Sequence, residues 1–405
     1  MNNHPTHLLR QTSSTKLKDK TIVLAVTGSI AAVRTVELAR ELIRHGARVK
    51  AVMSDAAAGI IHPDALHYAT GEPVITLITG AVEHVEYCGE GGTADLLLIA
   101  PCTANTISKM ALGIDDTPST TFAATALGND IPIVVVPAMH GTMFKHPAIV
   151  ENIKKLKGMG VHFVGPVIEE KIAKISTNEE IVLCTQRILG DNSLKDKRVI
   201  ITGGGTMESI DPIRVLTNRA SGRTGVALAQ EAFRRGADVV LVHPRKMGLY
   251  GITEVAAESA NEMMKSVLDE IYRGCDLVVS SAAISDYTIE PRKSKIKSGQ
   301  ELSLTLRPTA KLLQKVRENY PNLDIIGFKA ETRISDSELL ASGKELLRKY
   351  GLSMVVANDV GESGMGTEVN SVYLMDFSGA GAGPLKGTKQ LIASAIFEKY
   401  IGASK

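Results

Sequence analysis

The sequence contains no tryptophan, and aromatic residues make up only 4% of it. A chain this poor in aromatic side chains offers few surfaces on which the bases of single-stranded nucleic acid could stack. Its charge is nearly balanced, with 46 Lys and Arg against 44 Asp and Glu and a formal net charge of +2. It therefore lacks the broad cationic surface that binds nucleic acid or an anionic membrane. We expect small molecules as ligands, with no nucleic-acid partner and no membrane partner.

Cysteine and long apolar runs are also scarce. The four cysteines include no C-x-x-C pair, so neither a disulfide scaffold nor a zinc ribbon is indicated. No apolar run approaches the roughly 18 residues of a membrane-spanning helix. Residues 1–20 are polar and basic, without the apolar core of a signal peptide. These absences predict a cytoplasmic protein in a reducing environment.

What is present is a chain of 405 residues in which short apolar runs alternate with helical patterns. Unbroken apolar strands of this kind are typical of parallel sheets covered on both faces. A polar stretch near residues 190–197 separates two such regions. We expect an α/β protein with two Rossmann-like three-layer αβα domains in tandem, at 19–190 and 191–405, after a disordered tail at 1–18. The expected strands are 21–26, 48–53, 95–100 and 131–136, then 198–202, 237–242, 276–280, 324–327 and 353–357.

Both regions open with a strand and a glycine-bearing turn, but neither carries a dinucleotide fingerprint. The first turn has a single glycine, Gly28, and the second has Glu208 where a third glycine or alanine should stand. Neither region contains a P-loop motif. A nicotinamide-dependent oxidoreductase is therefore disfavoured. The turns either bind phosphate at a helix N-terminus or merely reverse the chain.

Polar residues follow several strands of the first region, and four segments carry a resemblance. They are residues 27–32 (TGSIAA), 83–86 (EHVE), 100–106 (APCTANT) and 137–140 (PAMH). Together they resemble the flavin-dependent cysteine decarboxylases. The resemblance implies a flavodoxin-like domain with FMN as cofactor, which oxidises the substrate thiol so that the adjacent carboxylate leaves. It implies His84 as a catalytic residue, Met139 and His140 as substrate-binding residues, and an FMN site of Gly28, Ser29, Ile30, Ser54, Thr103, Asn105, Ser108 and Lys109.

This region departs from the family pattern at two places. His140 stands where bacterial members have an asparagine that binds the substrate carboxylate. The segment 165–174 lacks the cysteine that the family uses as a proton donor. Glu169, Glu170 or Lys171 could take over that role, or the product could leave by another route. Cys184 lies on an apolar helical pattern and is expected to belong to the core.

The second region concentrates glycines, hydroxyls and basic residues. Its segments are 202–206 (TGGGT), 210–214 (IDPIR), 217–225 (TNRASGRTG), 282–287 (AAISDY), 292–297 (RKSKIK), 327–332 (GFKAET) and 357–360 (ANDV). Glycines and arginines at a helix start suit a phosphate group, although a capped helix with a solvated turn would also explain them. An acid followed by a lysine-rich loop suits a divalent ion beside phosphates.

These segments resemble the phosphopantothenate–cysteine ligases, the second half of the bifunctional coenzyme A biosynthesis proteins. The resemblance implies that CTP and Mg²⁺ (or Mn²⁺) activate 4′-phosphopantothenate as an acyl-cytidylate, which L-cysteine then attacks. Some relatives use ATP. It implies Asn218 and Lys295 as catalytic residues, Arg214 as a substrate-binding residue and Asp286 as a metal ligand. The implied nucleotide site comprises Gly203, Gly204, Ser280, Ser281, Ala282, Asp286, Lys295, Pro308, Thr309, Ala310, Lys311, Phe328, Lys344 and Lys349.

We therefore expect a bifunctional enzyme of coenzyme A biosynthesis. Ligation in the second domain would precede decarboxylation in the first, giving 4′-phosphopantetheine. The resemblance also implies a homo-oligomer, with trimers of the decarboxylase part and dimers of the ligase part. The alternative is a non-catalytic, flavin-binding regulatory subunit of the same fold, which the missing cysteine and His140 would suit.

Overall fold

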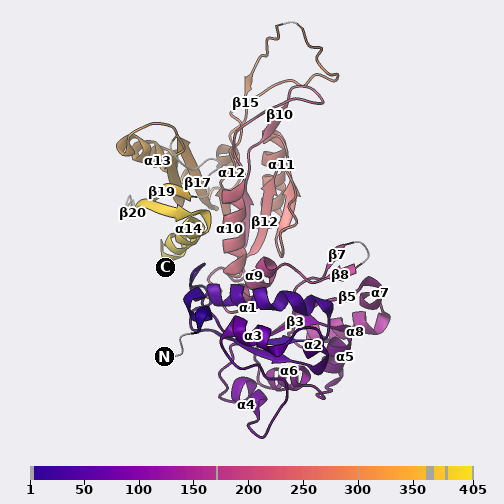
Figure 1. The fold of residues 1–405 in the computed structure, drawn as a ribbon. Helices are drawn as coiled ribbons and strands as arrows, with labels where there is room; N and C mark the ends of the chain where they lie inside the picture. Colours follow the sequence, from indigo (N-terminus) through magenta and orange to yellow (C-terminus); the bar gives the residue numbers. More distant parts are fainter. Residues whose placement is uncertain (1–3, 170–171, 300, 362–368, 379–381, 404–405) are drawn as a thin grey trace. The chain divides into compact units, whose positions relative to one another are not determined.

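The computed structural model describes residues 4–169, 172–299, 301–361, 369–378 and 382–403 (Figure 1). Contacts between Cα atoms divide the chain into two compact units, Met1–Gly190 and Asp191–Lys405. This division falls in the polar stretch where the sequence predicts a domain boundary. We call them unit 1 and unit 2 and describe each by itself.

Unit 1 is built on a five-stranded parallel sheet with the order β2-β1-β3-β4-β6. This is the flavodoxin-like strand order, in which the direction of the chain's crossover connections reverses between β1 and β3. Ligands of such sheets bind outside the carboxyl ends of the strands at that reversal. The strands are β1 (Thr21–Val26), β2 (Arg48–Met53), β3 (Leu96–Cys102), β4 (Ile133–Pro137) and β6 (His162–Phe163).

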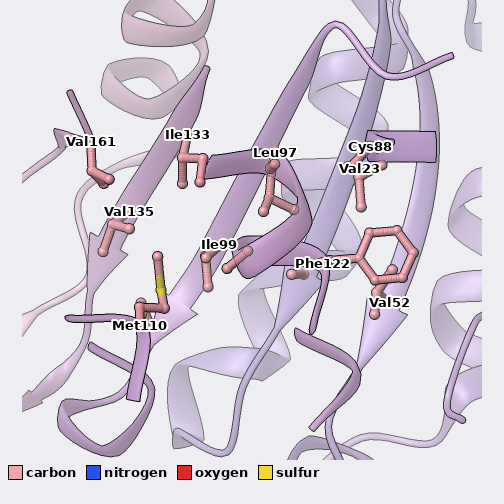
Figure 2. Close-up of a cluster of buried hydrophobic side chains, with 14 of the residues drawn as sticks. Val23, Val52, Cys88, Leu97, Ile99, Met110, Phe122, Ile133, Val135 and Val161 are labelled. Carbon is pink, nitrogen blue, oxygen red and sulfur yellow. The ribbon is translucent and has the colours of Figure 1, made fainter. Parts of the chain in front are cut away.

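The core of unit 1 lies on both faces of this sheet. Val23 and Ala25 of β1 belong to a cluster that also contains Phe122 and Met110, whose labelled side chains gather against the sheet in Figure 2. The intervening residue Leu24 is equally buried, so helices cover the other face as well. The helices are η2 (Ile30–Arg34), α1 (Thr35–Arg44), α2 (Asp55–Ala58), α3 (Pro63–Thr70), α4 (Glu83–Cys88), α5 (Ala104–Leu112), α6 (Pro118–Gly128), α7 (Gly141–Phe144), α8 (Pro147–Gly158) and α9 (Asn178–Ile188).

The expectation of a disordered tail at residues 1–18 is wrong for residues 4–18. They begin with a 3-10 helix, η1 (Pro5–Leu9), and pack on unit 1. The hydroxyl of Thr6 donates to the carbonyl of Tyr68 at 2.8 Å, and the Leu17 side chain is fully buried. These contacts come from single residues within a polar segment, so the composition of the segment does not indicate them.

A small antiparallel sheet lies at the end of β4. It consists of β5 (Met139–His140), β8 (Ile172–Lys174) and β7 (Val167–Glu169), in that order. Met139 pairs with Ala173, and His140 pairs with Ile172. The segment without the family cysteine is therefore a hairpin hydrogen-bonded to the strand that carries Met139. Of its three expected proton donors, Glu170 and Lys171 lie outside the described residues.

Unit 2 is built on an eight-stranded sheet with the order β13-β12-β9-β14-β17-β18-β19-β20. The first six strands are parallel and follow the Rossmann order, and the last two are antiparallel additions. The predicted α/β class of both units is confirmed. The strands are β9 (Arg198–Thr202), β12 (Asp238–His243), β13 (Thr253–Ala256), β14 (Leu277–Ser280), β17 (Asp324–Glu331), β18 (Met354–Asp359), β19 (Val369–Asp376) and β20 (Ala382–Thr388).

Two small antiparallel pairs complete unit 2, and Figure 1 shows the segment after β15 extending away from the large sheet. They are β10 (Met207–Ser209) with β11 (Val215–Thr217), and β15 (Tyr287–Thr288) with β16 (Arg307–Pro308). The helices are α10 (Arg223–Arg234), α11 (Ala260–Tyr272), α12 (Leu312–Asn319), α13 (Asp336–Tyr350) and α14 (Lys389–Ala403).

None of the four cysteines forms a disulfide bond within the described residues, and Cys184 is buried on α9, as its apolar surroundings in the sequence predict. No helix in the described part of the chain combines the length and the apolarity needed to cross a membrane.

Candidate active sites

Unit 1 has a cavity of about 550 Å³ at the carboxyl ends of its strands, which we call the unit 1 pocket. Four segments that follow β1, β2, β3 and β4 meet there, and the reversal between β1 and β3 lies among them. The lining residues are Thr27, Gly28, Ser29, Ser54, Asp55, Ala56, Thr103, Ala104, Asn105, Thr106, Lys109, Asp116, Thr117, Pro118, Ala138, Met139 and Met143. Seven of the predicted residues are among them: Gly28, Ser29, Ser54, Thr103, Asn105, Lys109 and Met139.

Local hydrogen bonds fix the wall of the unit 1 pocket. The Ser54 hydroxyl accepts from the backbone N–H of Ala57, and the Thr103 hydroxyl accepts from that of Thr106, each at 3.3 Å. These two residues therefore cap the helices α2 and α5 while lining the cavity. A Cβ on Gly28 would stand 2.5 Å from the Cβ of Ala56, so only glycine lets these two turns approach so closely.

Lys109 is paired within the unit 1 pocket. Its ammonium donates to both carboxylate oxygens of Asp116, at 2.7 and 2.8 Å, and both residues line the cavity. Asp116 comes from the loop before α6, whereas Lys109 lies on α5. The ion pair therefore links two walls of the pocket. It also partly neutralises the positive charge of Lys109, which would otherwise attract a phosphate.

Four predicted residues of unit 1 do not line the pocket. Ile30 is 77% exposed at the start of η2, and Ser108 accepts a hydrogen bond from Asn152 at 3.2 Å. His140 is exposed and acts as the N-cap of α7, where its Nδ1 lies 2.8 Å from the Thr142 hydroxyl. His84 lies on α4, which Figure 1 shows well away from β5 and α7.

His84 has an unusual environment on α4. Its Nδ1 atom is buried without a hydrogen-bond partner among the described residues. The helix begins after Val82, a β-branched residue with φ of 48° and ψ of 51°. Such a left-handed conformation is strained for valine and is often retained at functional sites. Exposed apolar side chains of Val82 and Val85 flank the histidine in the sequence.

Unit 2 has two adjoining cavities at the carboxyl ends of its parallel strands. The larger, of about 370 Å³, is lined by Ser280, Ala282, Ile284, Ser285, Asp286, Thr309, Ala310, Lys311, Leu312, Leu313, Phe328, Lys329, Ser342, Glu345, Leu346, Lys349 and Tyr350. The smaller, of about 130 Å³, is lined by Gly204, Ala220, Ser221, Gly222, Thr224, Gly225, Ser281, Ala282, Ala283, Phe328, Ala330, Asn358, Val360, Asn370 and Lys389. Ala282 and Phe328 line both cavities, which we call the larger and the smaller unit 2 pocket.

Most of the predicted nucleotide site converges on these cavities. Ser280, Ala282, Asp286, Thr309, Ala310, Lys311, Phe328 and Lys349 line the larger pocket, and Gly204, Ser281, Ala282 and Phe328 line the smaller one. Lys344 lies beside Lys349 in a shallow surface depression on α13. Pro308 and Gly203 do not line either pocket. Pro308 belongs to β16, and Gly203 lies behind the smaller pocket.

Glycines allow the close packing behind the smaller pocket. A Cβ on Gly225 would stand 2.7 Å from the Cα of Gly203, so the α10 backbone passes directly against the end of β9. Gly204 has φ of +79°, and a Cβ there would meet the Pro244 ring at 2.8 Å. This approach brings the N-terminus of α10 to the pocket.

The predicted catalytic and substrate-binding residues of unit 2 lie around the pockets. The Asn218 amide donates to the carbonyl of Ala283 at 3.0 Å, beside the smaller pocket. Arg214 donates to Asp211 at 3.0 Å and to the carbonyl of Ile296 at 3.2 Å. Lys295 is the exposed residue preceding Ile296. Arg214 thus contacts the loop that carries Lys295.

Asp286 lies in the larger pocket and forms an ion pair with Lys311. The described part of the chain has no group of three or more His, Cys, Asp or Glu side chains that could hold a metal ion. Mg²⁺ is commonly bound by one or two carboxylates together with substrate phosphates. An exposed single carboxylate within a pocket fits that mode of binding.

Glu208, which stands where a dinucleotide fingerprint would have a third glycine or alanine, has a structural role. It is buried, and it accepts hydrogen bonds from the backbone N–H of Ala260 at 2.8 Å and from the Thr288 hydroxyl at 2.7 Å. Its role is to join β10 to the N-terminus of α11 and to β15.

The sequence interpretation missed several pocket residues. In the smaller pocket, Asn358 and Lys389 are both more than nine-tenths buried. The sequence does carry a signal for Asn358, because it follows an apolar run within the segment 357–360 that resembles the ligases. Lys389 gave no such signal, because a lysine at the start of a helix is ordinarily solvated.

Family models of known proteins match each of the two units separately. The Flavoprotein family model matches residues 10–190, and the model of the DNA/pantothenate metabolism flavoprotein C-terminal domain matches residues 194–402. The coenzyme A biosynthesis bifunctional protein CoaBC of Thermococcus kodakarensis is 46% identical over 400 residues, 98% of each chain. Its namesake from Methanocaldococcus jannaschii is 40% identical over 401 residues, 98% of this chain and 97% of that one.

A solved structure similar to unit 2 is the crystal structure of the C-terminal domain of a coenzyme A biosynthesis bifunctional protein CoaBC. It is 29% identical and covers 52% of this chain and 97% of its own, with a TM-score of 0.43.

The fold and the pockets define a tandem α/β enzyme whose first unit is a flavoprotein. The chain belongs to the family of coenzyme A biosynthesis bifunctional proteins. The sequence-based assignment to this family, with decarboxylase and ligase activities in one chain, is confirmed.

Proposed function

We propose that unit 2 joins 4′-phosphopantothenate to L-cysteine at the expense of CTP, and that unit 1 decarboxylates the product to 4′-phosphopantetheine with FMN. The observation that carries this proposal is that each unit places its pocket at the strand ends of its sheet and lines it with predicted residues from separate segments. We assign the enzyme to the cytoplasm.

In unit 1, the turns at Gly28–Ser29 and Ser54 offer hydroxyls and a close backbone approach to the FMN phosphate. Thr103 and Asn105 line the wall at the N-terminus of α5, beside the flavin. Bound FMN supplies a two-electron acceptor for the substrate thiol. Met139 lines the same pocket and lies on β5, to which the hairpin of β7 and β8 is joined.

His84 and the unit 1 pocket belong to different copies of the chain in this proposal. His84 does not line the unit 1 pocket of the same chain. Its buried Nδ1 has no hydrogen-bond partner among the described residues. Its role is to hold or move a proton at the substrate thiol of a neighbouring copy. The family resemblance implies a homo-oligomer, trimeric through the decarboxylase part and dimeric through the ligase part, and such an assembly would allow a site shared between copies.

In unit 2, the phosphates of CTP would lie between Lys311, Lys349 and a Mg²⁺ ion on Asp286, with the base near Phe328. Asn218 and Lys295 would act on the activated carboxylate, with Arg214 holding the loop of Lys295. Mn²⁺ could replace Mg²⁺. ATP would be accepted only if the base contacts of the larger pocket permit it.

The test supplies the purified chain with 4′-phosphopantothenate, cysteine, Mg²⁺ and either CTP or ATP, and follows products by mass spectrometry. We expect phosphopantothenoylcysteine and then 4′-phosphopantetheine, with CTP preferred. Loss of FMN should stop the second product and not the first. A flavin-loaded protein that forms neither product would instead be the non-catalytic subunit.

His84→Asn should leave ligation intact while abolishing CO2 release. Mixing His84→Asn, after dissociation and reassembly, with a chain that cannot bind FMN should restore part of the decarboxylase activity. Each mixed oligomer then contains pockets that combine an intact flavin site with an intact histidine. Failure of every mixture to recover activity would place both groups in one copy.

A further inference from the structure

Glu254 and His243 form a buried pair in unit 2, and neither residue lines either of its pockets. His243 is the last residue of β12, and Glu254 lies on the neighbouring strand β13. Their side chains are only 6% and 7% exposed, and the Nε2 atom of His243 lies 3.0 Å from the Oε1 atom of Glu254. A carboxylate is rarely buried to this degree unless hydrogen bonds replace the water that it loses.

The loop between β12 and β13, residues 244–252, supplies the other hydrogen bonds to this carboxylate. Three consecutive backbone N–H groups donate to Glu254: those of Met247 at 2.9 Å, Gly248 at 2.7 Å and Leu249 at 3.1 Å. Burial by itself would raise the pKa of the Glu254 carboxyl group, but its hydrogen bonds outweigh burial and lower that pKa below its ordinary value. The carboxylate is therefore ionised at neutral pH and holds the middle of the loop.

The imidazole of His243 holds the first part of the same loop. Its Nδ1 atom accepts a hydrogen bond from the backbone N–H of Arg245 at 3.3 Å. Because Nδ1 is an acceptor, the ring proton is on Nε2, which donates to Glu254. Four backbone N–H groups of one loop thus depend on two buried side chains.

The loop begins at Pro244, which packs against Gly204. A Cβ on Gly204 would stand 2.8 Å from the Cδ atom of Pro244, so the proline ring lies directly against this glycine. Gly204 lines the smaller unit 2 pocket. The neighbouring N–H of Gly203 donates to the carbonyl of Val242, on β12, at 3.0 Å. The glycine turn, residues 203–205, is therefore supported by the end of β12 and by the start of the loop.

The glycine turn is hydrogen-bonded in turn to the segment that holds Asn218. The carbonyl of Gly204 accepts from the backbone N–H of Ala283 at 2.8 Å. The carbonyl of Ala283 accepts from the side-chain amide of Asn218 at 3.0 Å. Two hydrogen bonds thus connect the residue on which Pro244 packs with a residue that the proposed function places in the reaction.

We propose that Glu254 is a positioning residue of the ligase site, which acts with His243 through the loop and the glycine turn on Asn218. This rests on the proposed ligase function. It assigns Glu254 to the second step of ligation, because Asn218 acts there on the activated carboxylate. In that step the cysteine nitrogen forms a bond to the acyl carbon, the bond from that carbon to the phosphate oxygen breaks, and CMP leaves with its electron pair. The attacking amine releases one proton to the solvent.

The test follows the two steps of ligation separately in the full chain, in a single turnover at saturating CTP and 4′-phosphopantothenate. Pyrophosphate release reports the first step, and mass spectrometry of quenched samples reports the acyl-nucleotide and phosphopantothenoylcysteine. Glu254→Gln keeps the size of the side chain but replaces one acceptor oxygen with an amide that cannot accept. The cysteine step should slow about 10-fold to 100-fold, as expected for a misplaced catalytic group. Pyrophosphate release should stay within twofold, so the acyl-nucleotide accumulates.

Glu258→Gln is the matched control, since Glu258 is an exposed glutamate two residues beyond β13 that lines neither pocket. Both of its steps should match those of the unmodified chain. Pro244→Ala is the second variant, which decides the question if Glu254→Gln does not fold. It removes the ring that packs on Gly204 and should slow the cysteine step about threefold to tenfold. The two changes together should slow that step by no more than twofold beyond Glu254→Gln, because both act on one turn.

Two results would overturn the proposal. One is a folded Glu254→Gln or Pro244→Ala chain whose cysteine step stays within twofold of that of the unmodified chain. The other is an equal slowing of both steps of ligation, which would show that the pair only stabilises unit 2. An unmodified chain that forms no phosphopantothenoylcysteine would instead refute the proposed function itself.

Discussion

The carboxylate of Asp211 accepts a hydrogen bond from the backbone N–H of Ile296 at 3.1 Å, although 85 residues separate them. The other carboxylate oxygen accepts from the backbone N–H groups of Ile213 and Arg214, each at 2.8 Å. Asp211 therefore joins the turn after β10 to the loop that carries Lys295. Because Arg214 contacts both Asp211 and Ile296, the three residues form one connected unit.

Asp211→Asn should lower the ligase turnover on the order of tenfold to 100-fold, because a misplaced loop costs catalysis even when no catalytic group is removed. Asp211 acts here as a positioning residue for Lys295. The measurement is kcat and KM for ligation, with decarboxylation of supplied phosphopantothenoylcysteine as the internal control. Asp269→Asn, an exposed carboxylate on α11, should leave both activities unchanged. Equal losses in both activities would indicate general unfolding.

The order of this loop should persist at mildly acidic pH. The hydrogen bond from Ile296, followed by those from Ile213 and Arg214, lowers the pKa of Asp211 below its ordinary value. A depressed folded-state pKa means that the stabilisation is fully present above the ordinary pKa and is lost as the pH falls through the folded value. The amide resonance of Ile296, followed by NMR with labelled isoleucine, should therefore move only below the ordinary pKa of aspartate. Movement between neutral pH and that value would contradict this.

Gly28→Ala should abolish or strongly weaken flavin binding. The added methyl group would stand 2.5 Å from the Cβ of Ala56, which has no flexible end to move away. The turns after β1 and β2 must then separate, and the unit 1 pocket is distorted. Flavin absorbance per chain measures the loss, and ligation should be retained. Gly80→Ala, where no atom lies within 4 Å of the added group, should keep its flavin.

Gly225→Ala should destabilise unit 2 by about 1–3 kcal/mol, the usual cost of overpacking. Its Cβ would lie 2.7 Å from the Cα of Gly203, and two backbone segments cannot shift as freely as a side chain. Thermal unfolding with and without CTP measures the effect. Gly402→Ala, on α14 with no neighbour within 4 Å, should instead be neutral or stabilising by up to about 1 kcal/mol, because alanine favours helix. A stable Gly225→Ala with normal CTP binding would mean that the packing here is loose.

Nine strands of the two sheets could be predicted to within a few residues, because each contains an uninterrupted apolar run between polar turns, whereas β6, β13, β19 and β20 were not predicted. The run at 21–26 coincides with β1, and the run at 198–202 coincides with β9. The helical segment after β1 starts as the 3-10 helix η2 and becomes α-helical only at Thr35. Its periodicity alone does not distinguish the two kinds of turn.

Site residues on the turns directly after strands could be predicted, because strand ends meet at one edge of a sheet. Ser54 and Thr103 are examples. Residues brought in by later elements could not, because their position depends on tertiary packing. Lys389 reaches the smaller pocket only because α14 packs on α10. Asp116 illustrates the same limit, since its pairing with Lys109 depends on where the loop before α6 turns.

The smaller unit 2 pocket has a consequence for how the protein is made. Its lining begins at Gly204 and ends at Lys389, on the last helix of the chain. The lining of the unit 1 pocket ends at Met143. A ribosome has therefore released every residue that lines the unit 1 pocket while more than half of unit 2 is still to be synthesised. A premature stop between Met143 and α14 would leave a chain with every lining residue of the unit 1 pocket and an incomplete smaller unit 2 pocket.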